Sequence, residues 1–219
     1  MKEILEFIFE IIMKTRALKI LITLFLFLII CNPGNSIDSL RYYFSVNYSV
    51  DLSDTYGGGN LLTGEIGIAK SWYGINLSFG QFQSHSKFIY QIVVEGIDKK
   101  INIPFDELTI MQMGSISLKL SPIQNKIIET DLAFGISYAL SKNSRFNSVD
   151  YSYSLLNEKF DYLYKDYKLV MTHHFGFQFG FDIRFFIKPR MALQLNSRIQ
   201  DLSEGGTFFF VGTGLCFKL

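Results

Sequence analysis

The sequence predicts an all-β protein, an eight-stranded antiparallel up-and-down barrel that spans a membrane. Three observations predict this fold. Eight stretches of the chain alternate apolar and polar residues with the period of two that a β-strand requires. One face of these stretches carries large aliphatic and aromatic residues, whereas the other is rich in Gly, Ser and Ala. The connections between the stretches are alternately short and long.

The composition of the 219-residue chain agrees with a folded, membrane-facing protein. Hydrophobic residues make up 48% of it and only 19% are charged, which argues against disorder. The formal net charge is +1, so the sequence offers no basic excess for binding nucleic acid. The 22 Phe and 12 Tyr stand beside a single Trp, a content that suits a surface covered by lipid rather than water.

Residues 1–36 have the features of a secretory signal peptide. Basic residues precede the apolar run 20–30, and Gly34 and Ser36 supply the small side chains expected before a cleavage site. The run is short for a membrane-spanning helix, which needs about 20 apolar residues. Export is therefore predicted, with an uncleaved inner-membrane anchor as the alternative.

The predicted cleavage precedes Ile37, which leaves 37–219 as the barrel. The true translation start is predicted to be Met13, because a signal of ordinary proportions begins there. Cleavage would also remove Cys31 and leave Cys216 as the one cysteine, so no intrachain disulfide is expected.

The first four alternating stretches lie at about 41–51, 62–69, 73–80 and 110–120. In each, the apolar residues share one parity and the small or polar residues share the other. Tyr43 is the one large residue on the polar side of the first stretch. The apolar faces comprise Tyr42, Phe44, Val46, Tyr48 and Val50, then Leu62, Ile66 and Ile68, then Tyr73, Ile75, Leu77 and Phe79, and finally Ile110, Ile116, Leu118 and Leu120.

The last four stretches lie at about 128–140, 171–185, 191–200 and 209–219. The stretch 171–185 is the clearest, because every odd position except His173 is large and apolar and no even position is. The apolar faces of the other three comprise Ile128, Leu132, Phe134, Ile136, Tyr138 and Leu140, then Met191, Leu193, Leu195 and Ile199, and finally Phe209, Val211, Leu215, Phe217 and Leu219.

Either face of such a sheet could point inward. A soluble barrel or sandwich buries the apolar face, whereas a membrane barrel turns that face to lipid and fills its lumen with the polar face. Small residues on the polar face fit the narrow bore of eight strands. The short connections, at about 70–72, 121–126 and 187–190, fall at one end, and the long ones fall at the other. This sorting favours a membrane barrel with its short turns in the periplasm.

The two longest connections are predicted to be extended hairpins rather than loops, because long structureless loops are uncommon. Residues 87–95 and 100–104 would continue the third and fourth strands around a turn at 96–99. Residues 149–156 and 159–169 would likewise continue the fifth and sixth strands around Asn157 and Glu158. Strands three to six are therefore expected to project beyond the membrane as a partly exposed sheet.

The chain resembles the small outer-membrane β-barrels of Gram-negative bacteria, the OmpA-barrel, OmpX and opacity-like group. The C-terminal segment 212–219 carries the most specific likeness, with Gly214, Phe217 and Leu219 in the places of the family's terminal assembly signal. The terminal Leu replaces the usual Phe. The resemblance implies residence in the outer membrane, contact with its lipid, and insertion by the barrel-assembly machinery.

The family resemblance leaves the function open, because these barrels serve as anchors, adhesins, evasion factors and a few enzymes. We expect a non-enzymatic surface protein without a cofactor, which meets an extracellular or envelope partner through its long loops. A narrow porin-like channel for small or apolar solutes is the second expectation, and a lipid-modifying enzyme is the third.

The strand parities place seven charged residues inside the barrel. Unpaired buried charges are costly, so these side chains are expected to neutralise one another and close the bore rather than form a channel or a catalytic site. The predicted lumen residues are Glu65, Lys119, Glu129, Asp131, Asp182, Arg184 and Arg198.

Several other residues suggest chemistry that their positions disfavour. His173 and His174 are adjacent in a strand and point to opposite faces, so they cannot bind one metal together. His85, between two serines, is similar to the His and Ser of barrel lipid A deacylases. Those residues act with a carboxylate on a late strand at the lipid interface, whereas this triplet lies at the top of the third strand. Cys216 is expected to pack inertly in the lumen. The tyrosines of 151–167 suit either a membrane belt or a binding surface.

Overall fold

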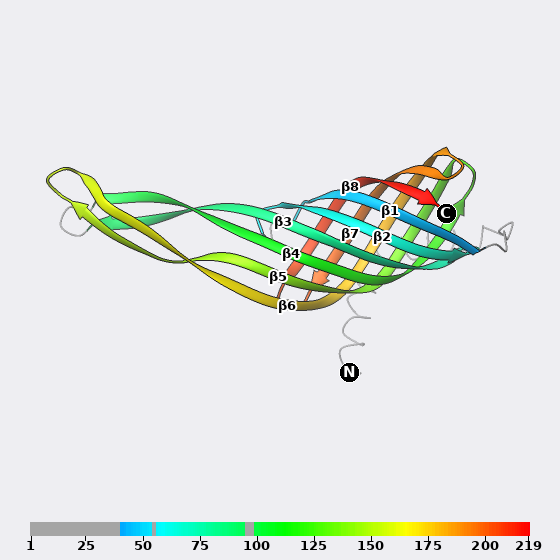
Figure 1. Cartoon of the computed structure of the whole chain (residues 1–219), viewed down its shortest axis with the longest axis horizontal. Coiled ribbons are helices and arrows are strands. Elements are labelled where there is room, and N and C mark those ends of the chain that lie inside the picture. The colour runs from blue at the N-terminus through cyan, green and yellow to red at the C-terminus, as the bar shows by residue number, and fades with distance from the viewer. Residues whose placement is uncertain (1–39, 54–55, 95–98) are drawn as a thin grey trace, which may run out of the picture.

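A computed structural model describes residues 40–53, 56–94 and 99–219, which form one closed barrel with its strands in chain order (Figure 1). The eight antiparallel strands confirm the predicted fold class. Within those ranges no helix is long and apolar enough to cross a membrane. The predicted signal peptide lies outside the described residues. The strands are β1 (Leu40–Asp51), β2 (Gly59–Lys70), β3 (Tyr73–Val94), β4 (Lys99–Gln124), β5 (Ile128–Ser154), β6 (Lys159–Lys188), β7 (Met191–Leu202) and β8 (Gly206–Lys218).

The register of the strands closes the ring with an offset. A row of hydrogen-bonded partners that begins at Tyr42 passes through all eight strands and reaches Phe209. Phe209 lies opposite Leu52, whose backbone N–H donates to its carbonyl at 2.8 Å. The row thus returns to the first strand further along the chain, and this stagger is what tilts the strands of a barrel.

The outer and inner faces follow the predicted parities. Outward side chains such as Ile66 and Phe177 are 61% and 72% exposed, whereas inward side chains such as Asn47 and Glu65 are each 1% exposed. A continuous apolar outer surface on a closed sheet matches contact with hydrocarbon, since a charge there would cost about 2–4 kcal/mol at the bilayer midplane. The prediction that the apolar face points outward and the polar face lines the lumen is confirmed.

The two ends of the barrel differ as expected. Tight turns join β2 to β3, β4 to β5 and β6 to β7 at one end, which we call the short-turn end. The first of them is a two-residue turn in which Ser71 has a left-handed φ of 56°. The C-terminus lies at this end, where Lys218 donates its N–H to the Arg190 carbonyl at 2.9 Å. We call the opposite end the long-loop end.

Two hairpins, β3–β4 and β5–β6, project far beyond the long-loop end (Figure 1). Pairing of β3 with β2 stops at Gln83, and pairing of β6 with β7 stops at Gly176, whereas β3 and β4 stay paired to Val94 and β5 and β6 to Ser154. The predicted projection of strands three to six is confirmed. Of the predicted turn at 96–99, residues 96–98 lie outside the described residues, and Lys99 begins β4.

The projecting strands do not form a single sheet, which corrects the expectation. Pairing between β4 and β5 ends at Leu108 and Ser144, and above this point the two hairpins pack through their faces. The rings of Phe105 and Phe146 have centroids 4.0 Å apart, and Lys165 Nζ donates to the Pro104 carbonyl at 2.5 Å. Face-to-face packing buries these rings, which an edge-to-edge sheet would leave exposed.

Candidate functional site in the barrel lumen

All seven predicted lumen residues point into the barrel. In each of their strands the apolar residues face outward, so these charged residues, which stand at the alternate positions, face the barrel axis. The side chain of Arg198 retains 13% exposure, and the others are more deeply buried. The structure thus places the seven side chains in the lumen and adds the pairing that the sequence did not give.

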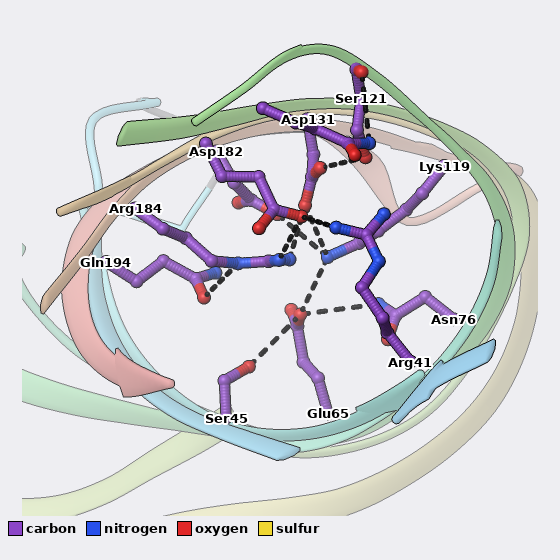
Figure 2. A network of polar contacts seen from close by, with 12 residues as sticks. Arg41, Ser45, Glu65, Asn76, Lys119, Ser121, Asp131, Asp182, Arg184 and Gln194 are labelled. Carbon is purple, nitrogen blue, oxygen red and sulfur yellow. Dashed lines mark hydrogen bonds and ion pairs between the residues drawn. The ribbon is translucent and has the colours of Figure 1, made fainter. Parts of the chain in front are cut away.

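Two cations hold the centre of the network (Figure 2). Arg184 forms ion pairs with Asp131 and with Glu129, the second at 3.4 Å. Lys119 Nζ lies 3.0 Å from Asp182 Oδ2 and 3.6 Å from a carboxylate oxygen of Glu65. These contacts link β2, β4, β5 and β6 across the bore, so the charges neutralise one another as expected.

The network also includes three cations at its margin, of which the sequence singled out only Arg198. Arg198 pairs with Glu65, while Arg41 and Lys218 reach Glu129 at 3.6 and 2.8 Å. Arg41 and Lys218 share the polar parity of β1 and β8 and lie at the short-turn ends of these strands. Among the described residues, five cations thus meet four carboxylates in the lumen.

Neutral side chains complete the coordination of the buried charges. Ser121 Oγ donates to Asp131 at 2.5 Å, and Asn76 Nδ2 donates to Glu65 at 3.3 Å. Gln194 Oε1 accepts from Arg184 Nε at 3.4 Å. Glu65, Asp131 and Arg184 therefore each have several partners, which reduces the desolvation cost that an isolated pair would carry.

Tyr43, the one large residue on the polar side of β1, contacts two cations of the network. Its ring faces the lumen, with the Arg184 guanidinium 4.6 Å and Lys119 Nζ 4.9 Å from its centroid. The ring also lies against Gly67, where a Cβ atom would be 1.9 Å from Tyr43 Cζ. Only glycine leaves room for an aromatic ring that is held between the backbone and two cations.

Replacing Gly67 with Ala should therefore lower the free energy of unfolding by about 1–3 kcal/mol, because the Tyr43 ring must leave the two cations. A urea titration in lipid vesicles, followed by gel mobility of unboiled samples, measures this change. Gly64→Ala is the matched control, because the space around its Cβ is open on the outer face. Equal stability of the two variants would contradict the assigned role of Tyr43.

A second layer of the lumen was missed by the sequence reasoning, which expected polar residues throughout. Near the long-loop end the bore is filled by an apolar plug of Leu61, Phe82, Met111, Met113, Ala139, Leu202, Phe208 and Phe210. Phe208 and Phe210 stack at 5.6 Å, and Phe82 meets Phe208 edge-on at 5.3 Å. Phe208 and Phe210 share the inward parity of β8, but the run of three Phe hides that alternation.

Tyr56 covers the plug from the connection between β1 and β2. Its ring stacks on Phe208 at 5.6 Å, and its carbonyl accepts hydrogen bonds from the hydroxyls of Ser84 and Ser86 at 2.5 and 2.6 Å. Burial raises the pKa of the Tyr56 hydroxyl, and the nearby Arg145 guanidinium partly opposes this rise. The ring is therefore neutral over the plug at physiological pH.

The other candidate residues do not assemble a reactive centre. His174 points inward and His173 outward, as predicted, and His174 bonds Thr172 at 2.9 Å and the Ser203 carbonyl at 2.9 Å. The ring of His85 points outward to Asp106 at 3.1 Å, away from the two serines that flank it. In the described part of the chain no three His, Cys, Asp or Glu gather as a metal site.

The predicted assembly-signal residues differ in orientation. Gly214 faces the lumen, where a Cβ would lie 2.0 Å from Asn47 Oδ1, while Phe217 and Leu219 lie on the outward parity. Leu219 is 80% exposed, and Cys216 is buried in the lumen beside Tyr43. The terminal apolar residues are thus available to a partner, and their recognition by the assembly machinery stays a prediction.

Comparison of the structure with solved structures confirms the resemblance at the level of the fold. Ail, the attachment invasion locus protein of Yersinia pestis, matches with a TM-score of 0.51 and 10% identity over 84% of this chain and 100% of Ail. Neisserial surface protein A matches with a TM-score of 0.54 and 8% identity over 83% and 99% of the two chains. OprG of Pseudomonas aeruginosa gives 0.51 and 9% over 82% and 96%.

No protein-family model and no curated protein matches the sequence itself. The likeness therefore concerns the arrangement of the strands, and function must be argued from the surfaces and the lumen of this chain.

Proposed function

We propose that this protein is a non-enzymatic outer-membrane barrel that presents its two projecting hairpins to a partner outside the cell. The observation that carries the proposal is the exposure of large apolar side chains on these hairpins, above the membrane. Ile89 is 73% exposed, Tyr164 is 65% and Leu156 at the β5–β6 turn is 98%. Apolar residues that neither lipid nor the barrel covers are typical of interaction surfaces.

The packing beneath these exposed residues makes the two hairpins a rigid surface for recognition. The hairpins pack on each other through Phe105, Phe146, Ile92 and Ile103, so they carry a small core of their own. Rigid aromatic side chains, including the tyrosines of β6, give contact area at a low cost in conformational entropy. The fold that the chain shares with Ail, the attachment invasion locus protein of Yersinia pestis, supports the same proposal.

The lumen supports a scaffold rather than a channel. The ionic network closes the bore toward the short-turn end, and the apolar plug closes it toward the long-loop end. A solute would have to displace both layers. The narrow porin-like channel is therefore the weaker proposal, and planar-bilayer recording of the purified protein should give no stable conductance.

Attachment of bacteria tests the proposal directly. A non-adherent Gram-negative strain that expresses the protein should bind cultured epithelial cells above the empty-vector level. The triple variant Ile89→Ser, Leu156→Ser, Tyr164→Ser should reduce that binding by roughly tenfold, because a few central apolar residues dominate most interfaces.

The control variant changes exposed cations of the same hairpins, Lys87→Gln with Lys168→Gln. Its retained binding would assign recognition to the apolar residues, whereas its loss would indicate an anionic polysaccharide. A heparin-coated surface belongs in the assay, because Ail has been crystallised with the heparin analogue sucrose octasulfate. Attachment no stronger than that of the vector strain would refute the proposal.

A further inference from the structure

The described turn segments at the short-turn end carry only positive charges outside the lumen. The described turn segments 68–75 and 120–128 contain Lys70 and Lys126, and neither segment contains an acidic residue. Both lysines are exposed. Glu129, the one acidic side chain near them, is buried and already paired with Arg41, Arg184 and Lys218. Within the described residues, these two turns therefore present exposed positive charges and contain no acidic side chain.

The two turns are held together as one unit. Gln124 Nε2 donates to the Ser71 carbonyl at 2.8 Å, and the Ser121 N–H donates to the Trp72 carbonyl at 2.7 Å. The indole of Trp72 is half exposed beside them and meets the Tyr73 ring edge-on. Exposed Trp and Tyr of this kind mark the level of lipid headgroups on a membrane protein.

An apolar groove lies on the outer face above the turn between β2 and β3, across the strands that the two turns join. It has a volume of about 460 Å³ and is lined by Ile75, Ile116, Leu118, Phe134, Ile136 and Phe177. Ile75 follows the Trp72 turn on β3 and pairs with Leu118 on β4. The groove thus runs from the positive turns toward the middle of the membrane, and its size is within the range of about 300–1,000 Å³ that holds small ligands.

We propose that the positive turns and the groove form a single site for an anionic phospholipid. Lys70 and Lys126 bind the phosphate of its headgroup, and one of its acyl chains lies in the groove. A lipid is favoured over an anionic polymer of the periplasm because the cations adjoin an apolar groove and an exposed indole, which water would not stabilise. This inference rests on the proposed placement in the outer membrane, with the short turns in the inner leaflet.

Trp72 is the only Trp of the chain and therefore reports on this site alone. The full protein, purified from an expressing strain, is reconstituted in phosphatidylcholine vesicles that contain either phosphatidylglycerol or phosphatidylcholine brominated near the carboxyl end of the acyl chains. Bromine quenches the indole on contact. The brominated phosphatidylglycerol should quench with an apparent affinity at least about fivefold higher, as expected for lysines at an anionic surface.

Two variants distinguish a specific lipid site from general electrostatic attraction between the protein and anionic lipid. Lys70→Gln with Lys126→Gln should bring the ratio of the two affinities close to one. Lys188→Gln with Arg190→Gln removes the same charge from the turn between β6 and β7, on the far side of the ring, and should leave most of the preference. An equal loss in both variants would overturn the proposed site, as would equal quenching of the unchanged protein by the two lipids.

The groove is tested by filling it. Ile116→Phe with Ile136→Phe keeps the lipid-facing surface apolar and should lower the apparent affinity for brominated phosphatidylglycerol. An unchanged affinity would overturn the place assigned to the acyl chain. If neither brominated lipid quenched Trp72, the short turns would not lie in a leaflet, and the membrane placement in the proposed function would fail as well.

Discussion

Replacing Arg184 with Met should lower the free energy of unfolding by about 3–5 kcal/mol, because the substitution leaves a buried carboxylate without its partner. Asp131 would retain only the ion pair with Lys119 at 3.6 Å, whereas Glu129 would keep Arg41 and Lys218. A urea titration in lipid vesicles, read by the mobility of unboiled samples on a gel, measures the change.

Two further variants identify the origin of this loss. Arg190→Met removes an exposed arginine at the same end of the barrel and should change stability by no more than about 0.5 kcal/mol. Adding Asp131→Asn to Arg184→Met should recover part of the stability, because the stranded charge is then neutralised. If the double variant were less stable than Arg184→Met alone, unpaired burial of Asp131 would not be the cause.

Replacing Phe82 with Ala should cost a similar amount, about 3–5 kcal/mol, because it empties the centre of the apolar plug. Phe82 is fully buried and contacts the rings of Tyr56, Phe208 and Phe210. The same titration measures the loss. Phe88→Ala, on the exposed part of the same strand, is the control and should stay within about 0.5 kcal/mol of the unchanged protein.

The Phe82 variant also tests whether the lumen has two independent closures. Because the ionic network remains in place, the variant should still show no stable conductance in a planar bilayer. Conductance that appeared with this single substitution would mean that the plug alone closes the bore.

The strands could be predicted from the sequence because lipid and lumen impose opposite demands on successive residues. The run around Phe177 illustrates this, since large side chains are required on one parity and excluded from the other. The same rule placed Glu65 and Arg184 in the lumen. It assigns only a face, however, so it gave no partner for either charge.

The remaining features depend on contacts between distant segments. The plug was missed because Phe208, Phe209 and Phe210 obscure the alternation, and because the polar network was extrapolated to the whole bore. The stacking of the two hairpins was missed because periodicity describes each strand alone. Whether β4 and β5 stay paired beyond Leu108 is decided by the burial of Phe105 against Phe146.

The arrangement of the lumen charges has a consequence for how the barrel assembles. Glu129 on β5 is held by cations from β1, β6 and β8, the first and last strands among them. In a partly inserted sheet that still lacked β8, Lys218 and Glu129 would not yet be paired with each other. The polar face of that sheet would be open to hydrocarbon, at a cost of several kcal/mol per ion. Closure of the complete ring removes this cost, so we expect the eight strands to insert together rather than one after another.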